Sequence, residues 1–163
     1  MARAATQKAE RPVESAAIDF AGLSDLAGFV VHLANLQLYR DYYERFAGNA
    51  AGLTLGAFSV MALIDANPGL RQGAAAEALL IKRSNMTKLI NRLERQGLVR
   101  RRASGRDRRS VGLHLTPLGR RRLGLMLPAI AAHDAEATAP LDVRERRLLV
   151  GLLGKVVFAK RAP

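Results

Sequence analysis

Apolar residues recur at three- and four-residue spacing along most of this chain, which is the pattern of amphipathic helices. The first such stretch begins after a predicted cap at Ser24, is apolar around most of its circumference, and ends before a Gly48-Asn49 pair. A second follows Thr54, another typical capping residue, and ends at the strong breaker formed by Asn67, Pro68 and Gly69. Further helices are expected at residues 72–79 and 83–96, after Pro117, and after Asp142.

The helix predicted at residues 83–96 has two different faces. Met86, Leu89, Ile90 and Leu93 form one apolar face, and Gly97 stands where a left-handed helix stop is expected. The opposite face carries short hydrogen-bonding side chains near the start of the helix and guanidinium groups further along. This mixture suits contacts to base edges and then to phosphates, although a plain solvated face has the same pattern. The residues of this face are Ser84, Asn85, Thr87, Lys88, Asn91, Arg92 and Arg95.

A basic hairpin is predicted directly after this helix. Residues 98–102 read as an extended run, residues 103–107 contain a Ser-Gly pair suited to a turn, and residues 111–115 alternate apolar residues at period two. Between residues 82 and 109 there are eleven Lys or Arg and two acidic residues, a local charge of +9 within a net charge of +12. Such a concentrated charge is the electrostatic footprint of a protein that binds nucleic acid.

The run from Asp107 to Gly119, with its Thr-Pro-x-Gly ending, resembles the wing signature of the multiple antibiotic resistance regulator (MarR) family. The segment 83–100 resembles the recognition helix of that family, and together the matching segments cover about half of the chain. Arg71, Leu80 and Lys82 depart from the usual pattern around the helix-turn-helix. The resemblance implies a mainly α fold with a small β-hairpin wing, in which a winged helix-turn-helix is joined to dimerisation helices.

The resemblance also divides the chain into regions. Residues 1–22 are Ala-rich without sustained periodicity, and we expect a mobile tail there. Residues 23–163 are expected to form a single MarR-type domain. Within it, residues 23–48 and 117–163 would supply the dimerisation helices, residues 54–116 the DNA-binding lobe, and residues 98–116 its wing.

The candidate DNA-binding residues divide by role. A dimer would place two recognition helices about 34 Å apart, so a pseudo-palindromic double-stranded operator is expected. At the wing tip, Asp107 is expected to pair with Arg109 and hold the hairpin. Ser84, Asn85, Thr87 and Lys88 are expected to face the major groove, Arg92 and Arg95 to reach phosphates, and Arg106 and Arg108 to reach the minor groove. Arg83 is also expected to bind DNA.

Regulators of the family that this chain resembles bind small molecules, often aromatic or phenolic acids. The ligand lies in a crevice between the DNA-binding lobe and the dimerisation helices. By that resemblance we expect an acidic aromatic effector or its coenzyme A thioester, with Arg40 neutralising a carboxylate or a phosphate. The same apolar positions at helical spacing would also be explained by an ordinary core. The candidate effector residues are His32, Asn35, Tyr39, Arg40, Tyr43, Phe58 and Met61.

Composition and residue spacing limit the other functional classes that this chain could belong to. The chain has 163 residues, no Cys, and hence neither disulfides nor a thiol switch. His32, His114 and His133 lie on separate predicted elements without metal-ligand or catalytic spacing, so we expect no enzyme, metal or cofactor. No apolar run is long enough to span a bilayer, and a cytoplasmic protein is expected. An architectural or RNA-binding winged helix, or a protein-interaction module, stays open as an alternative to an effector-controlled repressor.

Overall fold

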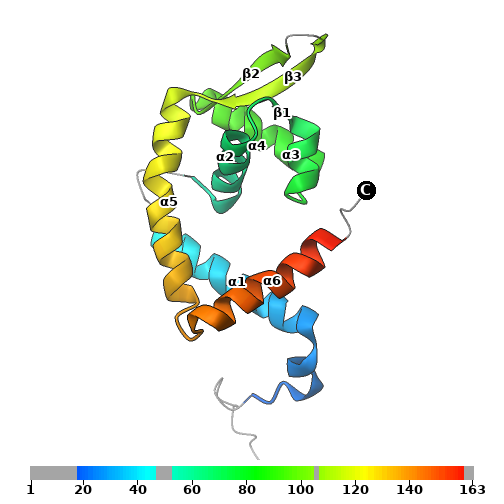
Figure 1. Ribbon diagram of the computed structural model, residues 1–163, viewed down its shortest axis with the longest axis vertical. Helices are drawn as coiled ribbons and strands as arrows, with labels where there is room; N and C mark the ends of the chain where they lie inside the picture. Colours follow the sequence, from blue (N-terminus) through cyan, green and yellow to red (C-terminus); the bar gives the residue numbers. More distant parts are fainter. Residues whose placement is uncertain (1–17, 47–52, 105–106, 160–163) are drawn as a thin grey trace, which may run out of the picture. The chain divides into compact units, whose positions relative to one another are not determined.

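The computed structural model describes residues 18–46, 53–104 and 107–159, and for residues 104 and 107–110 it describes the backbone alone. The chain forms two compact units, residues 1–39 and residues 40–163. Its described elements are η2 (Ala21–Asp25), α1 (Ala27–Phe46), α2 (Leu55–Ala66), β1 (Leu70–Arg71), α3 (Gln72–Ala78), α4 (Arg83–Arg95), β2 (Val99–Ser104), β3 (Asp107–Leu115), α5 (Pro117–Ala137) and α6 (Val143–Phe158), as Figure 1 shows. The prediction of a mainly helical protein with a small hairpin is confirmed.

In the first unit, η2 precedes the start of α1. Ser24 was predicted to cap the first long helix, and this is wrong. Ser24 lies inside η2, where its hydroxyl donates to the carbonyl of Ala21 at 3.0 Å, and α1 begins only at Ala27. The hydroxyl therefore serves a local turn that competes with capping. Of the predicted tail, residues 1–17 lie outside the described residues.

The second unit contains the hydrophobic core of the winged helix. Apolar side chains from α2, α3, α4, the sheet and the first half of α5 meet there, and the helical periodicity predicted this set for α2 and α4. Burial of this apolar area is the dominant favourable term in the folding of the unit. The side chains with no measurable exposure are Val60, Met61, Ile64, Ala75, Met86, Ile90 and Leu93.

Both helices of the helix-turn-helix end in the same hydrogen-bonded motif. After α4, Gly97 has φ +68° and Leu98 N donates to the carbonyl of Leu93 at 2.9 Å, which confirms the predicted stop. After α3, Leu80 takes the equivalent position with φ +54° and 77% exposure, and Ile81 N donates to the carbonyl of Ala76 at 2.9 Å. Leu80 thus adopts a conformation that favours glycine, and the turn keeps its geometry despite this departure from the family pattern.

The starts of α2, α5 and α6 follow the predicted caps. Thr54 accepts a hydrogen bond from Ala57 N at 3.2 Å, and Thr116 accepts one from Gly119 N at 3.0 Å with Pro117 at the first helical position. Asp142 and Glu145 form the expected capping box at the start of α6. Arg71 and Lys82, which replace the usual polar caps, cap α3 and α4 without a side-chain hydrogen bond.

The wing is part of a three-stranded antiparallel sheet in the order β1-β3-β2. Val99 pairs with Leu115 at the base of the hairpin, and an irregularity lies between Ala103 and Ser104 near its tip. The β2–β3 hairpin projects beyond the helices that it packs on (Figure 1). The two-residue strand β1 was not predicted from the sequence; it pairs with β3 through Leu70 and Leu113.

The base of the wing is joined tightly to α5. Thr116 Oγ1 donates to the carbonyl of Gly97 at 2.6 Å, and Thr116 N donates to the carbonyl of Leu98 at 3.0 Å. Gly119 lies so close to the backbone of Leu98 that a Cβ at this position would collide with the Leu98 carbonyl. The absence of a side chain at Gly119 therefore lets the first turn of α5 pack directly on the chain that enters the wing.

The terminal helix α6 leaves its apolar side chains uncovered in the single chain. Val156 is 75% exposed, and Leu148, Val150 and Phe158 are exposed nearly as much. Among the described residues, none of the helices combines the length and apolar character that crossing a membrane requires. An apolar face of this extent on a water-facing helix marks an interaction surface.

We expect Gly119→Ala to destabilise the protein by about 1–3 kcal/mol, because the added methyl group meets rigid backbone. The free energy of unfolding from urea denaturation measures this change. Gly124→Ala is the matched control in the same helix, since a Cβ there meets nothing within 4 Å. The control should be neutral or stabilising by up to about 1 kcal/mol through helix propensity. Equal effects of the two substitutions would contradict the close packing assigned to Gly119.

Candidate nucleic-acid interface

The exposed face of α4 carries the predicted base-reading residues at its N-terminal end. Burial of Met86, Ile90 and Leu93 fixes the rotation of the helix, and Ser84, Asn85 and Lys88 are consequently exposed. Their side chains make no hydrogen bond or ion pair with any other residue that the structure describes. The first two turns of α4 therefore expose donors and acceptors of the kind that read base edges, and their contact with bases stays a prediction.

Two other predicted DNA-binding residues take part in contacts within the chain. The Thr87 hydroxyl donates to the carbonyl of Arg83 at 2.9 Å and accepts a hydrogen bond from Gln72 Nε2 at 2.8 Å. Arg83 forms an exposed ion pair with Glu77 of α3 at 3.2 Å. Thr87 therefore helps to hold α3 against α4.

A polar network centred on Arg101 joins the wing to both helices of the motif. Its guanidinium group pairs with Glu94 and donates to Asn91 Oδ1 at 2.9 Å and to Gln72 Oε1 at 3.0 Å. Gln72 in turn donates to Thr87, so β2, α3 and α4 share one chain of hydrogen bonds. The sequence analysis counted Arg101 only among the basic residues of positions 82–109 and missed this role, because its partners lie up to 29 residues away.

The remaining basic residues lie around this network. Arg92 and Arg95 are exposed on the later turns of α4, where the sequence placed phosphate contacts. Arg106 lies outside the described residues, and for Asp107, Arg108 and Arg109 only the backbone of β3 is described. The expected pairing of Asp107 with Arg109 and the minor-groove contacts of the wing tip therefore stay predictions.

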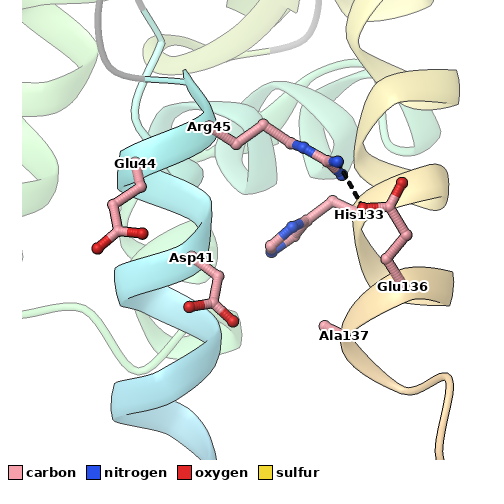
Figure 2. Close-up of a pocket in the computed structure, with 6 residues that line it drawn as sticks. All are labelled: Asp41, Glu44, Arg45, His133, Glu136 and Ala137. Atoms are coloured by element: carbon pink, nitrogen blue, oxygen red, sulfur yellow. Dashed lines mark hydrogen bonds and ion pairs between the residues drawn. The ribbon is translucent and has the colours of Figure 1, made fainter.

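A cavity of about 480 Å³ lies in the second unit between the end of α1 and the end of α5. Arg45 and Glu136 form an ion pair at 2.5 Å across it, and His133 points from α5 toward α1 (Figure 2). The cavity is lined by Asp41, Glu44, Arg45, His133, Glu136 and Ala137. The sequence analysis did not select these residues for an effector site, although the pairs at positions 41 and 44 and at 133 and 136 have the spacing of one helix face.

An aromatic cluster connects this cavity to the DNA-binding lobe. Tyr42 is buried, packs edge-on against His133 with ring centroids 6.0 Å apart, and contacts Phe46. Its hydroxyl donates to the carbonyl of Leu53, just before α2, at 3.1 Å. Burial, and then the neighbouring Tyr43, raises the pKa of the Tyr42 phenol above its ordinary value near 10, so this group remains a donor at neutral pH.

The residues predicted for an effector site do not line this cavity. Arg40 is exposed and pairs with Asp41 and Glu44 at 3.6 and 3.8 Å, and Tyr43 is also exposed. Phe58 packs against the winged-helix core and Met61 is completely buried inside it, which is the ordinary core role weighed above. His32, Asn35 and Tyr39 are exposed residues of the first unit.

Comparison with known proteins agrees with this geometry. The sequence model of the MarR family matches residues 51–110. A candidate transcriptional regulatory protein for the hcr operon of Thauera aromatica is 35% identical over 129 residues, which are 79% of this chain and 77% of that protein. The chain belongs to the MarR family.

Solved structures of a MarR-family neighbour extend the likeness to the fold. The transcriptional repressor CouR bound to a 23-mer DNA duplex is 34% identical, with a TM-score of 0.77 over 85% of this chain and 97% of that chain. CouR bound to p-coumaroyl-CoA is 31% identical, with a TM-score of 0.73 over 85% and 96% of the two chains. This MarR-family protein is accordingly a DNA-binding transcriptional regulator with a winged helix.

In this MarR-family regulator we expect Arg101→Ala to lower the free energy of unfolding by about 1–2 kcal/mol, because it removes partly buried charge-assisted hydrogen bonds. Operator affinity should fall about tenfold, because the wing and α4 would no longer be held in position. A tenfold loss corresponds to about 1.4 kcal/mol of binding free energy. The dependence of affinity on salt should be unchanged, because Glu94 already balances the charge of Arg101. Urea denaturation and fluorescence anisotropy at several salt concentrations measure these effects.

Arg102→Ala is the matched control for this prediction. Arg102 follows Arg101 in β2, is exposed, and has no side-chain partner among the described residues. Its loss should leave stability unchanged. If Arg101→Ala instead preserves stability and reduces the salt slope by about one phosphate equivalent, Arg101 contacts DNA directly and the network is not its role.

Proposed function

We propose that the protein is a homodimeric repressor that binds a pseudo-palindromic operator and is released from it by a small-molecule effector. The observation that carries the proposal is the exposed start of α4. Over its first two turns Ser84, Asn85 and Lys88 have no side-chain partner among the described residues, and Arg101 ties the adjacent wing to the same helix. The repressor CouR, seen with a DNA duplex, supports the DNA-binding mode.

The effector that we propose is an aromatic carboxylate or its coenzyme A thioester. Two observations support this class: the cavity between α1 and α5, and the capture of p-coumaroyl-CoA by the neighbour CouR. A ligand can release DNA only if it binds the non-binding arrangement of the protein more tightly than the DNA-bound one. Couplings of this kind are typically about 1–3 kcal/mol.

Fluorescence anisotropy with the DNA upstream of the chain's own coding sequence tests the proposal. Binding should be selective over random DNA, and one member of a panel of aromatic acids and thioesters should abolish it. The net charge of +12 favours a second candidate, an architectural nucleic-acid-binding protein without an effector. That candidate requires equal affinity for random DNA, a steep salt dependence and indifference to every compound.

Asn85→Ala and Arg92→Ala should separate base reading from phosphate contact. Loss of the Asn85 amide should cost about 1–3 kcal/mol on the operator and relax the preference at one base-pair position per half-site. Loss of Arg92 should weaken binding to all sequences similarly and reduce the salt slope by about one. Anisotropy on a set of single-base operator variants measures both effects. A sequence-independent loss for Asn85→Ala would remove it from the base-reading set.

Val156→Glu should dissociate the homodimer, because it places a charge in the exposed apolar stripe of α6 that we assign to the subunit interface. Sedimentation velocity should show a shift from dimer to monomer, and operator affinity should fall more than tenfold because both half-sites are no longer held together. Lys155→Gln, on the adjacent exposed position, is the control and should stay dimeric. A dimer that survives Val156→Glu would place the interface elsewhere.

A further inference from the structure

Asn91 is a further polar side chain on the exposed face of α4, beyond the first two turns of the helix. It lies seven residues after Ser84 and three after Lys88, so the three residues share one face of the helix. Asn91 is exposed, and because its side chain is short, its amide stays close to the helix surface. A major groove that receives the face of Ser84 and Lys88 therefore also receives Asn91.

The amide of Asn91 is held in one orientation by Arg101. The guanidinium Nη2 of Arg101 donates to Asn91 Oδ1 at 2.9 Å, and because a guanidinium group can only donate, the amide atom that faces it must be the oxygen. The same guanidinium group is fixed from two other sides, by Gln72 Oε1 at 3.0 Å and by the ion pair with Glu94. Rotation of the Asn91 amide would turn its N–H donors toward this cation and is therefore unfavourable.

This orientation determines what Asn91 presents to DNA. Its oxygen is turned to Arg101, and its Nδ2 group makes no hydrogen bond with the residues that the structure describes. Asparagine ordinarily reads adenine with both amide atoms, the oxygen accepting from N6 and the nitrogen donating to N7. That pairing requires both atoms to face one base edge together. Because the oxygen of Asn91 faces the guanidinium group instead, Asn91 offers donors alone to the groove.

The four bases differ in how they meet a group that only donates. In the major groove guanine presents two acceptors side by side, N7 and O6, whereas adenine presents an acceptor beside a donor. Cytosine presents a donor, and thymine presents one acceptor beside its methyl group. Guanine is therefore the best complement to Asn91. A phosphate oxygen also accepts, but the longer side chains of Arg92 and Arg95 are better suited to reach the flanking phosphates.

We propose that Asn91 is a further specificity-determining residue that reads a guanine in each half-site of the operator, and that Arg101 sets this preference by fixing the amide. The inference rests on the proposed function, because it requires sequence-selective operator binding. It concerns a different base pair from the one assigned to Asn85, which lies six residues earlier, about 9 Å along the helix axis. The Asn85 amide has no partner among the described residues and is not fixed in this way.

Operators that carry each of the four base pairs at each half-site position test the inference by fluorescence anisotropy with the full chain. At one position the parent protein should prefer guanine over adenine about tenfold, and Asn91→Ala should abolish that preference while the preferences at the other positions remain. Gln96→Ala, which removes an exposed amide from the end of the same helix, is the matched control and should keep every preference.

A modified base tests the contact at the level of one atom. Deazaguanine, in which carbon replaces N7, lacks one of the two acceptors that the amide of Asn91 would meet. Placed at the position identified above, it should weaken binding of the parent protein several-fold. Binding of Asn91→Ala should not change, because this variant has no amide to lose the contact.

Asn91→Asp inverts the hydrogen-bonding character of the side chain at constant shape. One carboxylate oxygen still faces Arg101, and the other replaces the donors with an acceptor. The preference should therefore change from guanine to cytosine, whose amino group donates to a carboxylate. Overall affinity falls because phosphates repel the carboxylate, so the readout is the ratio of affinities among the four base pairs.

Arg101→Ala tests the positioning role separately. Without the guanidinium group the Asn91 amide can rotate and pair with adenine, so the preference for guanine over adenine should fall below about twofold at this position alone. Arg102→Ala, the neighbouring substitution in β2, should leave the ratio unchanged. A merely structural role of Arg101 would lower affinity for all operators without changing this ratio.

Three results would overturn the inference. One is a preference for adenine at the position that Asn91 controls, and another is an equal loss on every sequence for Asn91→Ala, which would make it a phosphate contact. The third is a preference for guanine that persists in Arg101→Ala. Failure of the proposed function has different signatures. Equal affinity for operator and random DNA would reject selective repression and this inference together, whereas selective binding with the expected Asn91 effects but no release by any compound would reject the effector alone.

Discussion

Burial of one face of α4 is the constraint on which the DNA-binding surface depends. Met86, Ile90 and Leu93 have no measurable exposure, and they fix both the depth and the rotation of the helix in the core. Truncating one such side chain to Ala typically costs about 2–5 kcal/mol, so alternative rotations are strongly excluded. The polar residues at the start of α4 face solvent because the apolar face of the helix is fixed in the core. After the helix, the left-handed conformation of Gly97 turns the chain into the wing.

The basic surface contains two kinds of cation, and counting charges cannot distinguish them. Arg101 pairs with Glu94 and orients the wing relative to α4, whereas Arg92 and Arg95 lie exposed along the helix. Arg83 is tied to Glu77 through an exposed pair that water screens. The local charge of +9 therefore overstates the number of groups aimed at phosphates. Part of that charge makes the lobe rigid, which benefits specificity because base contacts require a fixed helix position.

Most features that depend on neighbouring residues could be read from the sequence; the exception is Ser24, whose hydroxyl serves the turn of η2 and caps no helix. The caps at Thr54, Thr116 and Asp142 and the stop at Gly97 are local, and the structure confirms each of them. Features that depend on distant partners could not. The strand β1 exists only because Leu70 pairs with Leu113, and the cavity forms where ends of two helices meet that lie about 90 residues apart in the chain. Helical spacing identified Phe58 and Met61 as apolar positions, but it could not separate a core from a pocket wall.

The position of the cavity bears on how a bound molecule could reach the DNA-binding lobe. His133 packs against Tyr42, and the Tyr42 hydroxyl holds the carbonyl of Leu53 at 3.1 Å, directly before the capped start of α2. Because burial raises the pKa of Tyr42, this hydrogen bond persists through the neutral pH range and does not act as a proton switch. A ligand that moves the His133 ring would therefore act through packing. It would shift the Tyr42 side chain and, through its hydrogen bond to Leu53, the backbone just before α2. Packed interiors leave little room to absorb a displacement locally, so a shift of this ring would be passed on to the rings of Tyr42 and Phe46 that it packs against.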